Sequence, residues 1–417
     1  MHPSSAIGFS VGFKRLAWSN LAAQSAEQIG LAAAPLVAVV ALGSGAGATG
    51  LLQTLHTLPF LLLAIPAGLL ADRMSRPRLM AAAEALRVAA LIAIVALAVP
   101  GMLTLPLLAL LGFLGACGTV VYSVAAPALV PSLVPAPALA AANARIELAR
   151  TVAFAAGPAL AGALVGWSGG APAFALAAAL SAGAVMLLAG VREPPQPQQP
   201  TVSARHPLDE LRQGIAFVFR HPLLKPVFLT QLIFSTAFFM LHAVYVPYAV
   251  HHLGLSAAQV GATLAAYGGG MVAGALLAPA IMRKLPFGIV VAIGPIAGLA
   301  AAALMVATIW APSLPLAALS FTLIGAGPIL WVISTGTLRQ TVTPAHLLGR
   351  VSAINIMAYG ARPVGAAMGA LVGGLFGAEI CLLVAAFGFA LQAVVILVSP
   401  AVRLARQPTM VWQQQPA

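Results

Sequence analysis

The feature that most constrains this chain is a series of twelve long apolar segments joined by short connections. Hydrophobic residues make up 61% of the chain and charged residues only 7%, whereas roughly a quarter of a soluble domain is charged. Each segment is long enough to cross a bilayer as a helix, which satisfies its own backbone polar groups. The sequence predicts an all-α integral membrane protein and excludes a soluble or disordered one. The segments lie near 16–42, 51–71, 79–98, 103–128, 141–167, 172–190, 227–250, 257–282, 287–308, 313–337, 350–376 and 380–400.

Positive charges lie on one side of this predicted arrangement. If the N-terminus is inside, the outer connections contain no Lys or Arg; these are 43–50, 99–102, 168–171, 251–256, 309–312 and 377–379. Basic residues cluster in the inner connections instead, which is the positive-inside pattern. It supports twelve crossings with both termini in the cytoplasm. The net charge of +12 is therefore best explained by orientation, and we expect no nucleic-acid partner.

The chain divides at a Pro- and Gln-rich stretch after the sixth segment. We predict an N-terminal six-helix bundle over 1–190, a cytoplasmic linker over 191–226 and a C-terminal six-helix bundle over 227–417. Within the linker, Leu208, Leu211, Ile215 and Val218 recur at helical spacing. This predicts an amphipathic helix on the inner membrane surface, with a solvated linker helix as the alternative.

The connection between the second and third segments carries a motif. Gly68 is followed after three residues by Asp72-Arg73 and then by Arg76 and Arg78. This resembles the loop signature of the major facilitator superfamily, and the resemblance extends over the whole chain. It implies two pseudo-symmetric six-helix bundles that move about a central site. It also implies a latch between the halves in the outward-facing state, for which the candidates are Gly68, Asp72, Arg73, Arg76 and Arg350. A solvated orientation signal is the alternative.

The fifth segment carries Gly157-Pro158 and then Gly162, which partly matches the antiporter motif of drug exporters in that superfamily. We expect these residues to pack helices closely, because small residues let backbones approach in lipid. Leu58-Pro59-Phe60 and Arg362-Pro363 resemble the macrolide-efflux and enterobactin-exporter branch of proton-driven exporters. The fourth segment departs from the family pattern, since it lacks the family's Arg.

Ionisable residues inside predicted spans are costly and usually functional. Glu27 lies roughly 16 Å into the first span at 1.5 Å per residue, so we expect it to bind protons, with a permanent ion pair as the alternative. Arg150 and Arg362 could pair with Glu27 or hold an anionic group of the substrate. Glu147 with Arg150, and Glu84 with Arg87, are each three residues apart and could simply pair with each other.

The resemblance implies that the first, fourth, seventh and tenth helices line the substrate cavity. The polar and aromatic residues on those helices are the substrate candidates Gln24, Tyr122, His242, Tyr245 and Trp331. Residues of this kind in spans also serve helix packing, so packing is the alternative interpretation for each candidate. Cys117 and Cys381 stand alone in apolar runs and give neither a metal site nor a disulfide framework.

These observations predict a secondary transporter in the bacterial plasma membrane, acting as a monomer with protons, the lipid bilayer and a small-molecule substrate as partners. We expect proton-coupled efflux of a small amphipathic compound of the drug, macrolide or siderophore type. Import of a nutrient by a symporter or uniporter is the alternative, and a membrane receptor or enzyme is a third. No enzymatic site, metal or cofactor is expected.

Overall fold

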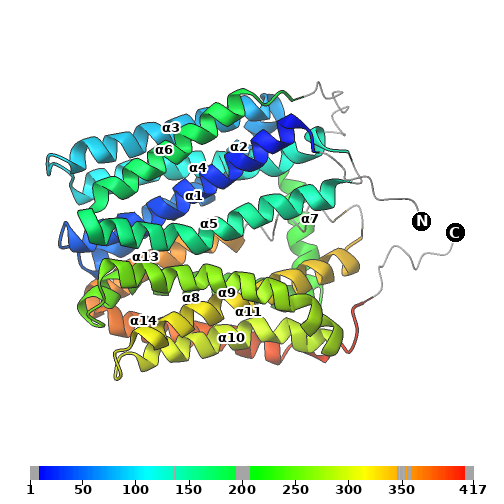
Figure 1. Ribbon diagram of the computed structural model, residues 1–417. Coiled ribbons are helices and arrows are strands. Elements are labelled where there is room, and N and C mark those ends of the chain that lie inside the picture. The colour runs from blue at the N-terminus through cyan, green and yellow to red at the C-terminus, as the bar shows by residue number, and fades with distance from the viewer. Residues whose placement is uncertain are drawn as a thin grey trace. The chain divides into compact units, whose positions relative to one another are not determined.

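A computed structural model describes residues 9–135, 138–193, 207–344, 347, 351, 354 and 358–408. Within these residues every regular element is helical, and eleven helices are long and apolar enough to span a membrane. They are α1 (Val11–Val40), α2 (Ala46–Arg73), α3 (Arg76–Ala98), α4 (Leu105–Leu133), α5 (Leu139–Ser168), α6 (Gly170–Ala189), α8 (Leu224–His251), α9 (Ala257–Lys284), α10 (Phe287–Ala307), α11 (Leu314–Val342) and α14 (Ala378–Leu397) (Figure 1). The expected all-helical membrane fold is confirmed.

The eleventh predicted span, 350–376, is described only in part. Its C-terminal portion forms α13 (Ala361–Phe376), which is apolar but shorter than the other spans, and a 3-10 turn, η3 (Ala358–Gly360), precedes it. Val351 and Ile354 are helical, and the other positions from 348 to 357 lie outside the described residues. A short 3-10 helix, η4 (Pro400–Arg403), follows α14.

Single glycines separate two pairs of helices at equivalent places in the two halves. Gly169 lies between α5 and α6 with φ of 82°, and Gly377 lies between α13 and α14 with φ of 88°. A left-handed residue ends a helix at low cost only when it lacks a Cβ. The two tight connections therefore follow directly from the sequence.

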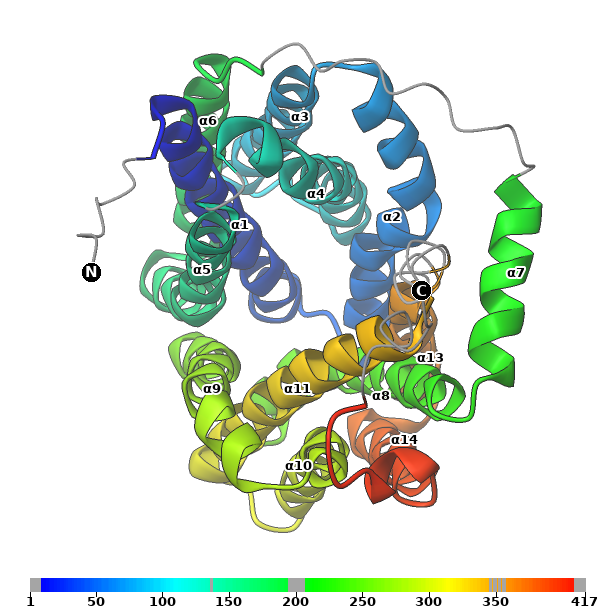
Figure 2. The ribbon, with the colours of Figure 1, turned by 90° about the vertical axis from the view of Figure 1, so that its right-hand side faces the viewer.

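The chain forms two compact units, and each is described by itself. Unit 1 comprises residues 1–44, 55–198 and 256–265, and unit 2 comprises 45–54, 199–255 and 266–417. In unit 1, α3 packs on α4 and α6, and α1 packs on α5 and α6. In unit 2, α10 packs on α11 and α14, and α8 packs on α13 and α14 (Figure 2). The second scheme repeats the first when each span is matched with the span six places later, as a pseudo-symmetric pair of bundles requires.

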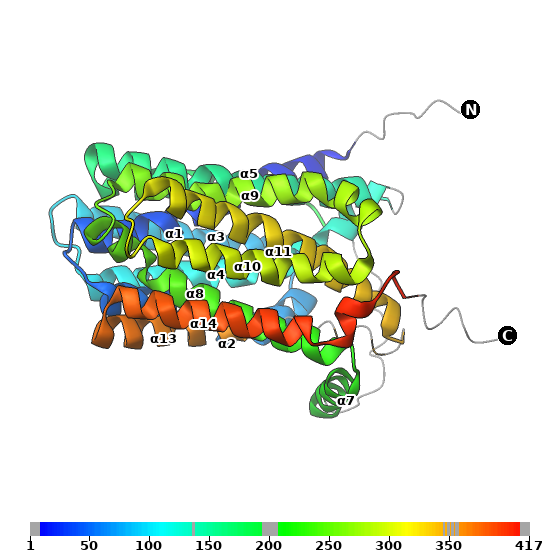
Figure 3. The ribbon, with the colours of Figure 1, turned by 90° about the horizontal axis from the view of Figure 1, so that it is seen from below.

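The linker contains α7 (Pro207–Arg220), the helix that the spacing of its apolar residues predicts. α7 runs across the direction of the spanning helices of unit 2, at the end where α8 begins (Figure 3). Val218 is buried in a hydrophobic cluster of this unit together with Leu224, Trp331 and Ile396. An amphipathic helix with this orientation suits a membrane surface.

Candidate functional site

A buried polar network lies at membrane depth in unit 1 and joins four helices. Glu84 and Arg87 of α3 form the expected ion pair, with Arg87 Nη1 2.9 Å from Glu84 Oε1. Ser181 of α6 donates to Glu84 Oε2 at 2.9 Å, and Arg87 donates to the carbonyl of Ala23 on α1 at 3.0 Å. Arg87 also donates to the hydroxyl of Thr119 on α4. Glu84 is fully buried and Arg87 is 4% exposed.

A second polar contact lies on the same helices. The hydroxyls of Ser19 on α1 and Tyr122 on α4 are 3.3 Å apart, and Ser19 also donates to the carbonyl of Ala184 on α6. Tyr122, a substrate candidate, is 2% exposed and belongs to the hydrophobic cluster of unit 1. Its described contacts are therefore with neighbouring helices.

Glu27 and Gln24 are half-buried on α1. They lie on either side of the buried Ala26 and within one turn of Ala23, the residue that Arg87 contacts. The helix that carries the predicted proton site is thus hydrogen-bonded to the buried charge pair of α3.

Glycines of the fifth span allow close helix packing. A Cβ on Gly157 would lie 2.5 Å from Gln28 Cβ on α1, and a Cβ on Gly162 would lie 2.5 Å from the Ala257 carbonyl at the start of α9. Conversely, a Cβ on Gly261 would lie 2.5 Å from the Pro158 carbonyl. All these contacts are within unit 1. They fit the packing role expected from small residues in lipid-embedded helices.

The loop motif contains an ion pair that sequence reasoning missed. The Arg76 side chain lies 2.7 Å from Glu193, which follows α6, and Glu193 Oε2 accepts from the Arg76 backbone N–H at 3.0 Å. The carboxylate thus sits at the first turn of α3, where the helix dipole favours negative charge. Arg73 is exposed. A Cβ added at Gly68 would have no neighbouring atom within 4 Å. The Asp72 side chain and Arg350 lie outside the described part of the chain.

Arg150 pairs with Glu147 on the same helix, α5, which is the alternative that the sequence left open. Its guanidinium also lies 5.3 Å from the centre of the Phe154 ring. Arg362, in the first turn of α13, lies 5.4 Å from the centre of the Phe239 ring on α8. Both arginines therefore lie over aromatic faces, an arrangement that stabilises a cation.

An aromatic cluster surrounds His242 in unit 2. The Phe238 and Phe239 rings of α8 lie 5.7 and 6.3 Å from the His242 ring, and Phe238 also lies 5.7 Å from Tyr267 on α9. His242 is half-buried, and its Nδ1 has no hydrogen-bond partner among the described residues. The described ring contacts of His242 are therefore with aromatic residues of its own helix.

Two further substrate candidates of unit 2 are buried. Tyr245 packs edge-on against Phe321 of α11 with ring centres 4.5 Å apart, and its side chain is fully buried. Trp331 of α11 is 5% exposed and donates from Nε1 to Gln231 Oε1 on α8 at 3.2 Å. Their described contacts hold helices together, which is the second interpretation that the sequence left open.

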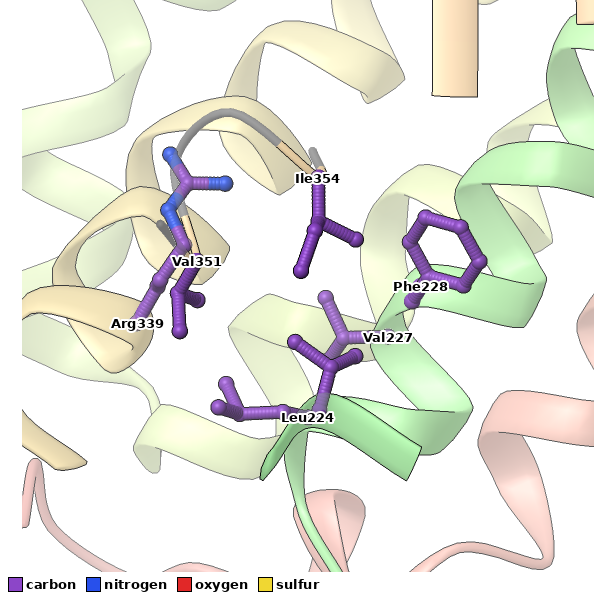
Figure 4. A pocket seen from close by; sticks show the side chains of 7 residues that line it. Leu224, Val227, Phe228, Arg339, Val351 and Ile354 are labelled. Carbon is purple, nitrogen blue, oxygen red and sulfur yellow. The ribbon is translucent and has the colours of Figure 1, made fainter. Parts of the chain in front are cut away.

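A small apolar pocket lies where α7 meets the start of α8. It is lined by Val218, Leu224, Val227, Phe228, Arg339, Val351 and Ile354, with Arg339 as its charged residue (Figure 4). Nearby, His221 Nδ1 accepts from the backbone N–H groups of Leu223 and Leu224 at 3.2 and 3.4 Å, and burial lowers the pKa of His221. The neutral imidazole therefore caps the first turn of α8.

Within the described ranges, no group of three or more His, Cys, Asp or Glu is placed to hold a metal ion.

Comparison with known proteins gives consistent results. The Major Facilitator Superfamily profile matches residues 16–361. A relative from Sinorhizobium fredii, described as the uncharacterized MFS-type transporter y4rN, is 32% identical over 254 residues. That match spans 58% of this chain and 60% of the relative.

The fold resembles several solved transporters. A bacterial homologue of the iron transporter ferroportin, in an inward-facing state, has a TM-score of 0.71 at 16% identity and covers 93% of this chain and 98% of its own. The D-xylose-proton symporter has a TM-score of 0.72 at 13% identity, covering 94% and 98%. At these identities the likeness concerns the fold alone. With the profile spanning most of the sequence, the chain belongs to the Major Facilitator Superfamily.

Proposed function

We propose that this protein is a secondary transporter that exports a small amphipathic compound in exchange for protons. The observation that carries the proposal is Glu27, a half-buried carboxyl on a helix predicted to cross the membrane, in a chain of this superfamily. A carboxyl within a spanning helix is a suitable proton carrier. Proton binding would shift the balance between two conformations if they differ in proton affinity.

Arg150 and Arg362 complete the proposed coupling set. Each lies over an aromatic ring, which helps to hold a cation away from water. A positive charge at membrane depth stabilises a carboxylate that has lost its proton. The two arginines would therefore favour proton release from Glu27 in whichever conformation brings one of them near.

For cargo contact we propose Gln24 and His242, which are half-buried on α1 and α8. Tyr122, Tyr245 and Trp331 would act by shaping the walls, since each is almost fully buried. An aromatic cluster beside a single imidazole suits a partly apolar compound with few charges. The Asp72 and Arg350 latch remains part of the proposal, with Gly68, Arg73 and Arg76 in the same motif.

The Gly157-Pro158 and Gly162 segment and the resemblance to the macrolide-efflux and enterobactin-exporter branch support export. We further propose location in a bacterial plasma membrane, with both termini cytoplasmic, and function as a monomer. The relative from Sinorhizobium fredii supports a bacterial setting.

The test compares accumulation of a macrolide, a lipophilic cation and a catecholate siderophore in bacteria with and without the gene. Wild-type protein should lower accumulation of at least one compound, and Glu27→Gln should abolish that effect without loss of expression. Glu379→Gln is the matched control, because Glu379 is 40% exposed beside His252 and has no role in the proposal. Higher accumulation in cells that carry the gene would indicate import, and unchanged export by Glu27→Gln would reject the role of Glu27.

A further inference from the structure

We propose that Glu84 is a second proton-binding carboxyl, and that its protonation releases Arg87 from α1 and α4. This proposal rests on the proposed proton-coupled function and adds a site to it. Glu84 lies eight residues after Arg76, where α3 begins, or about 12 Å along the helix at 1.5 Å per residue. No water reaches its side chain, which is fully buried.

The two oxygens of Glu84 have different surroundings. Oε2 accepts from Ser181 at 2.9 Å and from Arg87 Nη1 at 3.1 Å. Oε1 lies 2.9 Å from the same Nη1, within ion-pair range, but no donor among the described residues is directed at it. A buried carboxylate oxygen without a hydrogen bond is costly, and binding a proton removes that cost. Oε1 is therefore the atom that the proton would join.

Protonation changes what the pair can do. A proton on Oε1 would remove the negative charge of Glu84, so the ion pair with Arg87 Nη1, 2.9 Å away, would lose its negative member. A buried guanidinium without its charge partner is strongly disfavoured. Arg87 must then move, and its contacts with Ala23 and Thr119 would break.

Those two contacts connect the site to the rest of unit 1. Ala23 precedes Glu27 by four residues, one turn of α1, so release of Arg87 frees the helix that carries the first proposed proton site. Thr119 lies one turn before Tyr122, which contacts Ser19 of α1. Protonation of Glu84 would therefore loosen α1 and α4 together.

Few other titratable groups face the pair. At this depth α1 contributes Glu27 and α4 contributes Cys117 and Tyr122, while α6 contains no ionisable residue. If a pH response is lost in Glu84→Gln and retained in Glu27→Gln, it therefore comes from the buried pair.

The test is infrared spectroscopy of the purified protein in lipid nanodiscs, titrated from about pH 8 to about pH 5 without any cargo. We expect the carbonyl stretch of protonated carboxylic acids to grow as the pH falls. Glu84→Gln should remove one component of this band, and that component should persist in Glu27→Gln and Glu147→Gln. Hydrogen exchange in α1 near Ala23 should rise with the same midpoint. Because the titration uses no cargo, its result can be interpreted even if the export assay fails.

Ser181→Ala provides a second test in case Glu84→Gln does not fold. It removes one donor to the charged carboxylate, so the midpoint should move up by about one pH unit. A permanent ion pair predicts that Glu84→Gln lowers the melting temperature and leaves every pH-dependent band in place. That result, or an unmoved midpoint in Ser181→Ala, would overturn the proposal.

Discussion

At the residue scale, Gly118 is the point where α4 meets the backbone of α3. A Cβ at this position would lie 2.4 Å from the Ala83 carbonyl oxygen, far inside contact distance. Gly115, one turn earlier on α4, has only the flexible Arg87 side chain near it, with Cγ at 3.8 Å. The two glycines differ in whether an added methyl group has room.

We predict that Gly118→Ala destabilises the protein by about 1–3 kcal/mol, the usual cost of overpacking. Gly115→Ala should have little effect and serves as the control. Thermal unfolding of both variants in detergent measures the difference. Equal melting temperatures would show that α3 and α4 do not approach as closely as described.

Sequence reasoning identified individual ionisable residues more readily than their partners. It expected Glu84 with Arg87 and Glu147 with Arg150, because residues three apart share a helix face, and both pairs are present. It missed the pairing of Arg76 with Glu193, which are 117 residues apart. It likewise missed Ser181 as a donor to Glu84. Such contacts depend on which helices lie side by side, and a single sequence does not contain that information.

At the element scale, hydropathy predicted the helices well, because each span must satisfy its backbone in lipid. A capping box opens α9, with Ser256 and Gln259 exchanging hydrogen bonds. The division into packing units was harder to predict. Residues 45–54, at the start of α2, belong to unit 2, and residues 256–265, at the start of α9, belong to unit 1. No change in composition marks either segment.

The joint between α7 and α8 depends on a neutral histidine. His221 Nδ1 must lack a proton to accept from Leu223 and Leu224, and burial lowers the pKa of His221 from its usual 6.5. Between the lowered pKa and 6.5 the unfolded chain binds more protons than the folded one. This contribution to stability is therefore complete above about pH 6.5 and is lost as the pH falls below it.

We predict that the melting temperature of the wild-type protein falls between pH 7.5 and pH 5.5 by more than that of His221→Asn. Asparagine can accept the same backbone hydrogen bonds but does not titrate. Differential scanning fluorimetry at the two pH values provides the measurement. An identical pH dependence in the two proteins would show that His221 does not contribute to the pH dependence of stability.

At the scale of the whole molecule, the two units repeat one packing scheme six spans apart. The repeat explains why Gly169 and Gly377 form matching one-residue connections. It also explains why small residues recur at equivalent crossings, as in Gly157 of α5 against α1 and Gly369 of α13 against α8. We propose an orientation with the basic residues in the cytoplasm, since positive charge is generally retained there.

This orientation predicts cysteine accessibility. In a protein with Cys117 and Cys381 replaced by alanine, Ala311→Cys should react with a membrane-impermeant maleimide in intact cells. Met74→Cys, which is 50% exposed in the structure before substitution, should react only after the cells are permeabilised. Labelling of Met74→Cys in intact cells would reverse the predicted topology.

Proton exchange is the central claim, and everted membrane vesicles test it most directly. Vesicles from cells that carry the gene are energised by respiration, and acridine orange reports the acidic interior. Adding a compound whose accumulation the gene lowers should release protons and restore the dye fluorescence, with wild-type protein but not with Glu27→Gln. Uptake of that compound into the vesicles without any proton release would contradict proton-coupled export.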